Sequence, residues 1–412
     1  MQPVPSIDVK ALSVAQVYKG DVHMGELRRT GHGASFVYAD SAIGSEGVAY
    51  SMPPTRKTYE VAGYNLHPFF AGLLPEGMRL KALRNILKTS EDDLFTLLLG
   101  SGGDTIGDIS ISAAETAPHA IRGEAYELEQ VNFHELFQSS IATQDPAERA
   151  KDLTIAGVQP KISAGMISFP VQVKMRRRFC ILKLSPTEFP RISENEFFFT
   201  EMAGACGLEV PRCMLVKDRD GSSGLLLERF DRRFNKSSKK AEKIHQEDAC
   251  QFLDRYPADK YRLSFREIAE GVAMRSSAPI VECAKLLRLK AFSYLITNGD
   301  LHAKNISIAT DPGTGSVRLT PAYDLVATLP YGDRAMALSF EGRDDNLKAR
   351  DFIAFGERCS VRAPAMRRIL SELVEVSAHW IERLNEIGLS EKQTANLASV
   401  MRKRREDLSL ER

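Results

Sequence analysis

The sequence predicts an α+β fold in which a small N-terminal α+β domain precedes a bilobal core. Three observations lead to this prediction. The chain has 412 residues, more than one compact core usually holds. Short strand-like runs fill the first hundred residues and return between residues 153 and 231, and the pattern is mainly helical afterwards. Strand-rich sequence followed by helix-rich sequence is typical of two lobes with a ligand between them.

The composition is that of an ordinary globular protein, with 43% hydrophobic and 26% charged residues. Lys and Arg total 55 against 54 Asp and Glu, so the formal charge of +1 gives no electrostatic basis for non-specific binding to nucleic acid. The N-terminus lacks a signal-peptide pattern, no apolar run is long enough to span a membrane, and the six cysteines are scattered without zinc-ligand spacing. We therefore expect a cytoplasmic chain with reduced thiols and no membrane partner.

The N-terminal domain is expected to cover residues 1–113. Its strand-like runs, each followed by a turn signal, are VAQVYKG, DVHMGEL, ASFVYA and GVAYSM. Apolar residues at helical spacing predict a helix over residues 80–99, with Pro75 and Glu76 as its start signal. The glycine-rich stretch GSGGDTIGDISIS then predicts a turn and a last strand.

Residues 114–148 are polar and interrupted by proline, and they predict a linker with one short helix. Residues 149–231 predict the first lobe of the core. Its elements are strands in TIAGVQPKISAGMISF and FCILKLS, an amphipathic helix in ENEFFFTEMAGACGL, and two strands joined by an Asp-Gly turn in MLVKDRDGSSGLLLERFD. Residues 232–412 predict a helical second lobe, with AFSYLITNG in a central helix and a hairpin in ISIATDPGTGSVRLTPAYD.

The stretch NGDLHAKN (residues 298–305) carries the strongest chemical signal, because it places Asp300 and Asn305 five positions apart. Phosphoryl transfer needs a carboxylate that accepts or orients the proton of the attacking hydroxyl, and an amide oxygen that reaches a magnesium ion. Asp324, in PAYDL, supplies a second carboxylate for the metal after one predicted hairpin. Hard oxygen ligands of this kind suit Mg²⁺.

Taken alone, this spacing is weak evidence, since Asp and Asn are common in turns and caps. The order of the motifs strengthens it. A strand lysine, a helix glutamate, a hinge-like strand, the Asp-x-x-x-x-Asn pattern and a second Asp follow one another as they do in protein kinases.

Lys183 is the strand lysine of this series, within FCILKLS. Burying a lysine among apolar residues is costly without an anionic partner, and a phosphate is a suitable one. The alternative is an edge-strand lysine that points to solvent. The expected ion-pair partner in the following helix is Glu194 or Glu196, with Glu196 slightly favoured.

Two further segments are candidates for nucleotide contacts. Small residues around Gly157, between predicted strands, would let backbone N–H groups approach phosphate oxygens, with Lys161 adding charge. On its own this loop reads as an ordinary turn. Glu228 and Phe230 lie where a hinge strand would contact adenine, although core packing is the commoner use of a phenylalanine. His302 either contacts phosphate or braces the loop.

Together these motifs resemble the HipA family of bacterial toxin kinases over nearly the whole chain. The N-terminal block is similar to the domain that this family places before its kinase core, through VYKG, HMGEL, LLPEG and GGDTIGDISI. The core is similar through LTIAGVQPKIS, ILKLS, ENEFF, LLERFDR, NGDLHAKN and TPAYDL. The resemblance implies a bilobal protein-kinase-like fold and a serine/threonine kinase that uses ATP and Mg²⁺.

Carried over by position, the resemblance implies a role for each matching residue. Asp300 is the implied catalytic base, and Asn305 and Asp324 are the implied magnesium ligands. The other implied nucleotide contacts are Ala156, Gly157, Val158, Gln159, Pro160, Lys161, Lys183, Glu228, Arg229, Phe230, His302, Lys304 and Tyr323, besides Asn305 and Asp324 themselves. The family autophosphorylates a serine just before the glycine loop, which ejects the loop and silences the kinase. Here that position holds Thr154, a departure that leaves the efficiency of the switch open.

The resemblance also implies partners. These are a HipB-like helix-turn-helix antitoxin, operator DNA mainly through that antitoxin, and an aminoacyl-tRNA synthetase as substrate, glutamyl-tRNA synthetase above all. Two other functions stay open on sequence alone. One is an antitoxin-binding co-repressor with weak catalysis, which the complete catalytic set argues against. The other is a small-molecule phosphotransferase, against which the N-terminal domain and the loop at Thr154 favour a protein substrate.

Overall fold

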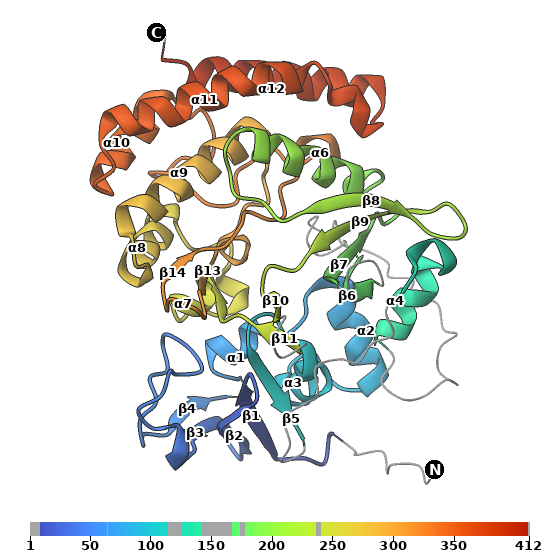
Figure 1. Ribbon diagram of the computed structural model, residues 1–412, viewed down its shortest axis with the longest axis vertical. Coiled ribbons are helices and arrows are strands. Elements are labelled where there is room, and N and C mark those ends of the chain that lie inside the picture. The colour runs from blue at the N-terminus through green and yellow to red at the C-terminus, as the bar shows by residue number, and fades with distance from the viewer. Residues whose placement is uncertain are drawn as a thin grey trace.

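The N-terminal domain lies at one end of the molecule and the long helices of the second lobe at the other, with the first lobe on one flank between them (Figure 1). The computed structural model describes residues 9–63, 65–113, 126–141, 167–173, 178–235 and 240–410. We call residues 9–113 the N-terminal domain, residues 126–231 the small lobe and residues 232–410 the large lobe. The predicted α+β, bilobal fold with an N-terminal domain is confirmed.

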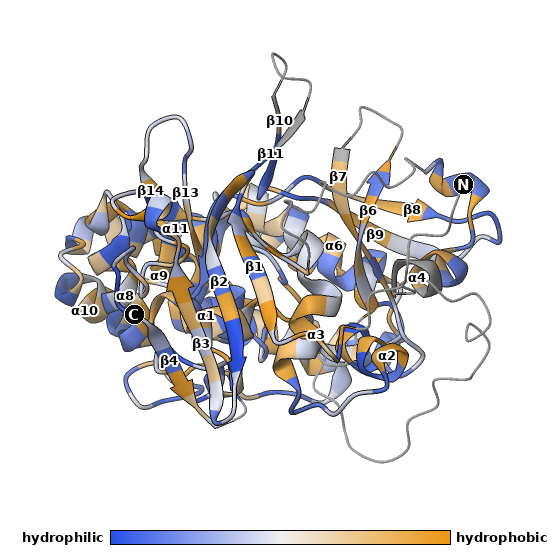
Figure 2. Cartoon of the chain, turned by 90° about the horizontal axis from the view of Figure 1, so that it is seen from below, coloured by the Kyte–Doolittle hydropathy of each residue, from blue (hydrophilic) through white to orange (hydrophobic). Residues whose placement is uncertain are grey.

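The N-terminal domain is built on a five-stranded antiparallel sheet in the order β4-β3-β2-β1-β5. Its strands are β1 (Val14–Lys19), β2 (Val22–Thr30), β3 (Gly33–Tyr38), β4 (Tyr59–Ala62) and β5 (Ile109–Ser112). Buried apolar side chains from these strands pack against Phe69 and Phe70. Figure 2 shows orange, hydrophobic segments on β3 and a blue end on β2, where Arg28 and Arg29 are exposed.

The run GVAYSM is not a strand, so that prediction is wrong, and the sequence analysis missed β4. Val48, Ala49 and Met52 are buried, which explains their apolar character. The backbone there forms a tight turn closed by an Ala49–Met52 bridge. The hydroxyl of Tyr38 accepts from the backbone N–H of Val48 at 2.8 Å and donates to the carbonyl of Met52, so a side chain takes the place of a neighbouring strand.

The single helix predicted over residues 80–99 is two helices, α2 (Gly77–Leu87) and α3 (Leu94–Ser101), preceded by α1 (Pro68–Gly72). Lys88 adopts a left-handed conformation (φ 49°) that ends α2. Asp93 then caps α3 by accepting a hydrogen bond from the backbone N–H of Thr96 at 3.3 Å. Helical periodicity continues across this break because both helices bury leucines.

The small lobe contains a four-stranded antiparallel sheet in the order β6-β7-β9-β8. Its elements are β6 (Ile167–Val173), β7 (Arg178–Leu184), α6 (Ile192–Ala205), β8 (Cys213–Lys217) and β9 (Ser223–Glu228). The predicted helix ENEFFFTEMAGACGL and the predicted strand pair around the Asp-Gly turn are confirmed.

The segment predicted as a linker contains α4 (Phe133–Ile141), which is part of the small lobe's core. Phe133, Leu136 and Phe137 are buried against the sheet residues Phe169 and Leu182. The polar sequence on either side of these three apolar residues accounts for the linker prediction. The helix covers one face of the sheet rather than connecting two domains.

The large lobe begins with a hairpin, not with a helix, and its helices enclose the largest hydrophobic core of the described residues. The hairpin and a small sheet comprise β10 (Arg232–Asn235), β11 (Lys240–Lys243), β12 (Gln246–Asp248), β13 (Ser307–Thr310) and β14 (Val317–Leu319). The helices are α7 (Ala249–Phe252), α8 (Phe265–Arg275), α9 (Pro279–Leu295), α10 (Ala349–Arg358), α11 (Ala363–Ile381) and α12 (Glu391–Leu408). None of the helices in the described ranges is long and apolar enough to cross a membrane.

Short 3-10 helices lie between these elements. They are η1 (Asp40–Ala42), η2 (Gly102–Asp104), η3 (Leu128–Gln130), η6 (Pro257–Asp259), η7 (Ala303–Asn305), η8 (Leu329–Tyr331) and η9 (Leu384–Ile387).

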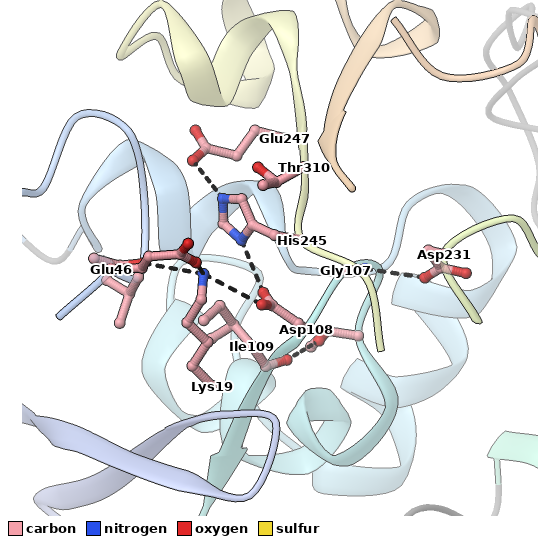
Figure 3. A network of polar contacts seen from close by, with 12 residues as sticks. Lys19, Glu46, Gly107, Asp108, Ile109, Asp231, His245, Glu247 and Thr310 are labelled. Carbon is pink, nitrogen blue, oxygen red and sulfur yellow. Dashed lines mark hydrogen bonds and ion pairs between the residues drawn. The ribbon is translucent and has the colours of Figure 1, made fainter. Parts of the chain in front are cut away.

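A buried group of charged residues joins the N-terminal domain to the large lobe (Figure 3). His245 lies between two carboxylates, with Nδ1 2.8 Å from Asp108 and Nε2 3.1 Å from Glu247. Lys19 contacts the second oxygen of Asp108 at 3.2 Å, and Glu247 accepts the backbone N–H of Tyr50 at 2.6 Å. We call Lys19, Asp108, His245 and Glu247 the interdomain clasp.

The charge states of the clasp follow from these contacts. Burial alone would lower the pKa of His245, but Asp108 and the hydrogen bond to Glu247 raise it to about 9. Burial alone would raise the pKa of Asp108, but His245 and Lys19 lower it to about 2. His245 is therefore charged at neutral pH and attracts carboxylates on both sides.

We expect His245→Gln to destabilise the protein in a pH-dependent way. The folded pKa of about 9 lies above the unfolded value of about 6.5. The stabilisation from His245 is therefore complete below about pH 6.5 and is lost as the pH rises through about 9. At pH 6 the variant should lose about 3 kcal/mol of unfolding free energy in urea, since the buried Glu247 loses its cation and Asp108 loses one of its two.

The exposed His32 gives the matched control. His32→Gln should change the free energy of unfolding by less than about 0.5 kcal/mol at any pH. A stability gap between wild type and His245→Gln that stays constant from pH 6 to pH 9.5 would contradict the assigned charge.

Candidate active site

A cavity of about 320 Å³ opens where the small lobe, the large lobe and the N-terminal domain meet. The small lobe contributes residues of β6, β7 and the end of β9, and the N-terminal domain contributes residues 72–76 and Arg79. The residues predicted from sequence that line this cavity are Lys183, Glu228, Arg229, Phe230, Asp300, His302, Lys304, Asn305, Tyr323 and Asp324. The fold thus brings predicted residues from four separate segments to one cavity.

The loop after α9 owes its shape to backbone turns and amide contacts. Thr297 has a left-handed backbone (φ 61°) that ends the helical path. The side chain of Asn298 accepts the backbone N–H of Asp300 at 3.0 Å and donates to the backbone carbonyl of Asp324 at 3.3 Å. One amide therefore ties the segment of Asp300 to the segment of Asp324.

Gly299 is required by close packing. A Cβ atom at this position would lie 2.6 Å from the carbonyl oxygen of Ala335 and 2.8 Å from the hydroxyl of Thr328. The backbone N–H of Gly299 donates to that hydroxyl at 2.9 Å. The glycine next to Asp300 thus lets the loop approach the neighbouring segment, a role that the spacing of Asp300 and Asn305 did not reveal.

A hydrogen bond helps to fix the side chain of Asp300, and another that of Asn305. The hydroxyl of Tyr261 donates to Oδ1 of Asp300 at 2.8 Å, and Nδ2 of Asn305 donates to Oδ2 of Asp324 at 3.0 Å. Oδ1 of Asn305 is buried and has no hydrogen-bond partner among the described residues. Sequence reasoning missed Tyr261, because nothing in the local pattern connects it with a residue 39 positions later.

Lys183 is buried between two carboxylates, so the solvent-facing alternative for this residue is wrong. Its ammonium lies 2.6 Å from Oε1 of Glu196 and also pairs with Asp324. The prediction that slightly favoured Glu196 is confirmed, since Glu194 pairs with Arg191 at 2.8 Å instead. Burial alone would lower the pKa of Lys183, but Asp324 and Glu196 raise it above its usual value. Lys183 therefore stays charged.

α6 also fixes the backbone beyond Asp324. Asn195 accepts from the backbone N–H of Ala327 at 2.9 Å and donates to its carbonyl at 3.0 Å. Asp324 itself has a left-handed backbone (φ 56°), which aspartate tolerates better than most residues. Neighbouring residues of one helix, Asn195 and Glu196, thus place Asp324 and Lys183 relative to each other.

His302 is buried beside Asp300, and its ring packs edge-on against Tyr261 at 5.1 Å. Burial, and then the positive charge of Lys260, lower the pKa of His302 to about 3, so the imidazole is neutral at physiological pH. Neither ring nitrogen has a hydrogen-bond partner within the described ranges. Both nitrogens are buried in a residue that lines the cavity.

Lys304 is held by the protein itself. Its ammonium lies 3.0 Å from Oε1 of Glu76 and 3.5 Å from Asp248, and it donates to the carbonyl of Gly72 at 3.2 Å. Burial alone would raise the pKa of Glu76, but Lys304 and Lys260 lower it below its usual value. Sequence reasoning missed Glu76 as a site residue, although it had marked the LLPEG segment.

Tyr323 contacts the loop that carries Asp300 and Lys304. Its hydroxyl donates to the carbonyl of Lys304 at 2.7 Å and lies 2.6 Å from the hydroxyl of Ser307. Its ring packs at a tilt against Phe230, with 5.8 Å between the centroids. Tyr323 therefore links the predicted hinge to the loop of Asp300.

Arg229, at the end of β9, has structural partners. Its guanidinium donates to Asp231 at 2.8 and 2.9 Å and to the carbonyl of Thr105 in the N-terminal domain at 3.1 Å. The backbone N–H groups of Glu228 and Arg229 are bonded to the carbonyls of Arg212 and Phe179. The side chain of Arg229 thus joins two domains.

The glycine loop lies outside the described residues, as does the predicted phosphorylation site. These positions are Thr154, Ala156, Gly157, Val158, Gln159, Pro160 and Lys161.

Two family models match the chain. The HipA N-terminal domain matches residues 15–112, and the HipA-like C-terminal domain matches residues 153–381, which are 229 of the 412 residues. The chain belongs to the HipA family. The resemblance predicted from the motifs is thereby confirmed.

Relatives of known name align with most of the chain. The putative kinase Y4mE of Sinorhizobium fredii is 27% identical over 385 residues, which cover 88% of this chain and 90% of the relative. The serine/threonine-protein kinase toxin HipA of Shewanella oneidensis is 26% identical over 389 residues and 82% of each chain. Together with the family match, these relatives identify the chain as a kinase.

The fold is shared with a solved HipA structure. The Shewanella oneidensis HipA chain, in a complex with HipB and operator DNA, superposes with a TM-score of 0.71 at 22% identity. The match covers 95% of this chain and 96% of that one. The N-terminal domain and both lobes are thus common to the two folds.

We expect Lys183→Met to destabilise this HipA-family kinase by about 3–5 kcal/mol, because it leaves the buried Glu196 without its cation. Urea unfolding measures this loss. The double variant Lys183→Met/Glu196→Leu should recover part of it, since apolar residues replace both charges. Glu194→Gln is the matched control and should cost less than about 1 kcal/mol. A double variant less stable than Lys183→Met would contradict the assigned pair.

Proposed function

We propose that this HipA-family chain is a serine/threonine protein kinase toxin that transfers the γ-phosphate of ATP to a protein hydroxyl. One observation carries the proposal. A buried lysine contacts both a helix glutamate and an aspartate that also accepts from Asn305, and Asp300 lines the same cavity. This is the set of groups that phosphoryl transfer needs to hold phosphates, a metal and an attacking hydroxyl.

The side chains at this point fit magnesium. Asn305 is 3% exposed, and its Oδ1 has no hydrogen-bond partner among the described residues, although a buried amide oxygen normally has one. The Nδ2 of the same side chain donates to Asp324, so the amide oxygen of Asn305 and the carboxylate of Asp324 are close together. Oxygen ligands of this type suit Mg²⁺. Asn305 and Asp324 would hold the ion.

The protein's own groups have distinct tasks in this proposal. Lys183, kept charged by two carboxylates, attracts the phosphates. Asp300, fixed by Tyr261, orients the acceptor hydroxyl and takes its proton. His302 is neutral and offers a ring N–H for a hydrogen bond to an anionic oxygen. When bound, Mg-ATP supplies the phosphoryl group and the positive charge that offsets its oxygens.

We assign the base to the apolar lining of the cavity. Ile181, Leu227, Phe230 and Val326 belong to this lining and come from β7, the end of β9 and the segment after Asp324. Apolar and aromatic walls suit a purine ring. We assign residues 228–230 as the hinge that holds adenine.

The partners belong to the same proposal. The solved Shewanella oneidensis HipA is bound to HipB and operator DNA. By analogy, we propose a HipB-like helix-turn-helix antitoxin for this chain, with operator DNA contacted mainly through it. We propose an aminoacyl-tRNA synthetase as the substrate, glutamyl-tRNA synthetase first, in the cytoplasm, with growth arrest as the result. Phosphorylation of Thr154 would place about two negative charges beside a phosphate-binding loop and act as an off-switch.

Labelled ATP tests the kinase directly. Wild-type protein with Mg²⁺ should label itself or a synthetase, and Asp300→Asn should lower the rate by at least about 100-fold while leaving the melting temperature nearly unchanged. Chelating the magnesium should abolish labelling. Wild-type protein that transfers no more phosphate than Asp300→Asn to any protein substrate would overturn the proposal.

A growth assay distinguishes a catalytic role of the protein from a role in antitoxin binding. Expression of the wild type should arrest growth, and Asp324→Ala should relieve the arrest because it removes a metal ligand. Arrest that persists in soluble, folded Asp324→Ala would instead support the antitoxin-binding co-repressor.

A further inference from the structure

The LLPEG segment of the N-terminal domain forms one wall of the cavity, which the proposed kinase chemistry does not explain. Residues 72–76 and Arg79 line this wall, and Glu76 lies at the N-cap of α2. Its side chain makes no cap hydrogen bond. Each carboxylate oxygen instead meets a lysine of the large lobe, Oε1 with Lys304 at 3.0 Å and Oε2 with Lys260 at 2.6 Å.

Each of the two lysines is connected with one end of the loop that carries Asp300 and Asn305. Lys304 directly precedes Asn305. Lys260 directly precedes Tyr261, whose hydroxyl donates to Asp300 at 2.8 Å. The backbone carbonyl of Lys260 also accepts the N–H of Ala303 at 3.0 Å. A single carboxylate thus contacts the residue before the proposed metal ligand Asn305 and the residue before Tyr261, which donates to Asp300.

We propose that Glu76 is a positioning residue of the kinase site, through which the N-terminal domain holds Asp300 in its working orientation by way of Lys260 and Tyr261. The inference rests on the proposed kinase function and adds to it a residue from outside both lobes. It makes the N-terminal domain a part of the active site. Tyr261 is the second positioning residue in the same series of contacts.

The contacts predict an unequal effect on the two ends of the loop. Without the carboxylate of Glu76, Lys304 keeps Asp248 and the carbonyl of Gly72. For the ammonium of Lys260, Glu76 is the one carboxylate partner among the described residues, and the ammonium also lies 5.4 Å from the ring centroid of Tyr261. Loss of Glu76 should therefore disturb Asp300 more than Asn305. Turnover should suffer more than nucleotide binding.

Steady-state kinetics of Glu76→Gln, Lys260→Met and Tyr261→Phe test this. Each should lower kcat by about 10- to 100-fold, the usual effect of a displaced catalytic group, and change the KM for ATP by less than about threefold. The double variant Glu76→Gln/Lys260→Met should be no slower than the worse single variant, because both act through one contact. Glu76→Asp should recover part of the rate. Additive losses, or a KM effect as large as the kcat effect, would overturn the positioning role.

Asp108→Asn is the matched control, since it weakens the interdomain clasp, whose members do not include Glu76, Lys260 or Tyr261. It should lower the melting temperature at least as much as Glu76→Gln and keep kcat within about twofold. An equal kcat loss in Asp108→Asn would show that mere attachment of the N-terminal domain matters, and would overturn the specific role of Glu76.

Hydrogen exchange separates this inference from the kinase proposal. In Glu76→Gln, the amides of residues 299–305 should exchange faster than in the wild type, whereas in Asp108→Asn they should stay protected. This readout needs no turnover. If exchange is faster in Glu76→Gln but the wild type has no kinase activity, the kinase proposal is wrong and the contact made by Glu76 still holds. If exchange and kcat are both unchanged in Glu76→Gln, only the positioning role of Glu76 is wrong.

Discussion

The structure depends above all on a charged lysine buried between two carboxylates. Lys183 is 6% exposed and Glu196 is fully buried, so neither charge is stable there without the other. Their contact with Asp324 joins a strand and a helix of the small lobe to the large lobe. These ion pairs therefore hold the two lobes together at the cavity and fix the orientation of the Lys183 ammonium.

Among the polar contacts that attach the N-terminal domain to the kinase core are three groups. The interdomain clasp is one of them. A second joins Arg229, Arg232 and Asp231 to the backbone of Thr105 and Gly107. The third is Glu76, which reaches into the cavity. The domain therefore contributes to the walls of the cavity together with both lobes.

Much of the fold and of the candidate site could be predicted from the sequence, because the residues that determine these elements are close to one another along the chain. The strand of Lys183, the helix of Glu196 and the hairpin before Asp324 follow from periodicity and turn residues. Contacts between distant segments gave no such signal. Tyr261 and Glu76 meet Asp300 and Lys304 only after the chain has folded, and the Tyr38 hydroxyl replaces a strand partner for Val48. The break between α2 and α3 was missed because a left-handed residue does not interrupt hydrophobic spacing.

Calorimetric titration with a non-hydrolysable ATP analogue tests the central claim most directly, because it measures whether Lys183, Asn305 and Asp324 form one site for Mg-ATP. The account predicts that the wild type binds the analogue more tightly with magnesium than without it, and that Asp324→Asn loses this dependence. Lys183→Met should bind weakly in both conditions. A wild type that binds equally well with and without magnesium, or an Asp324→Asn variant that keeps the full magnesium effect, would contradict it.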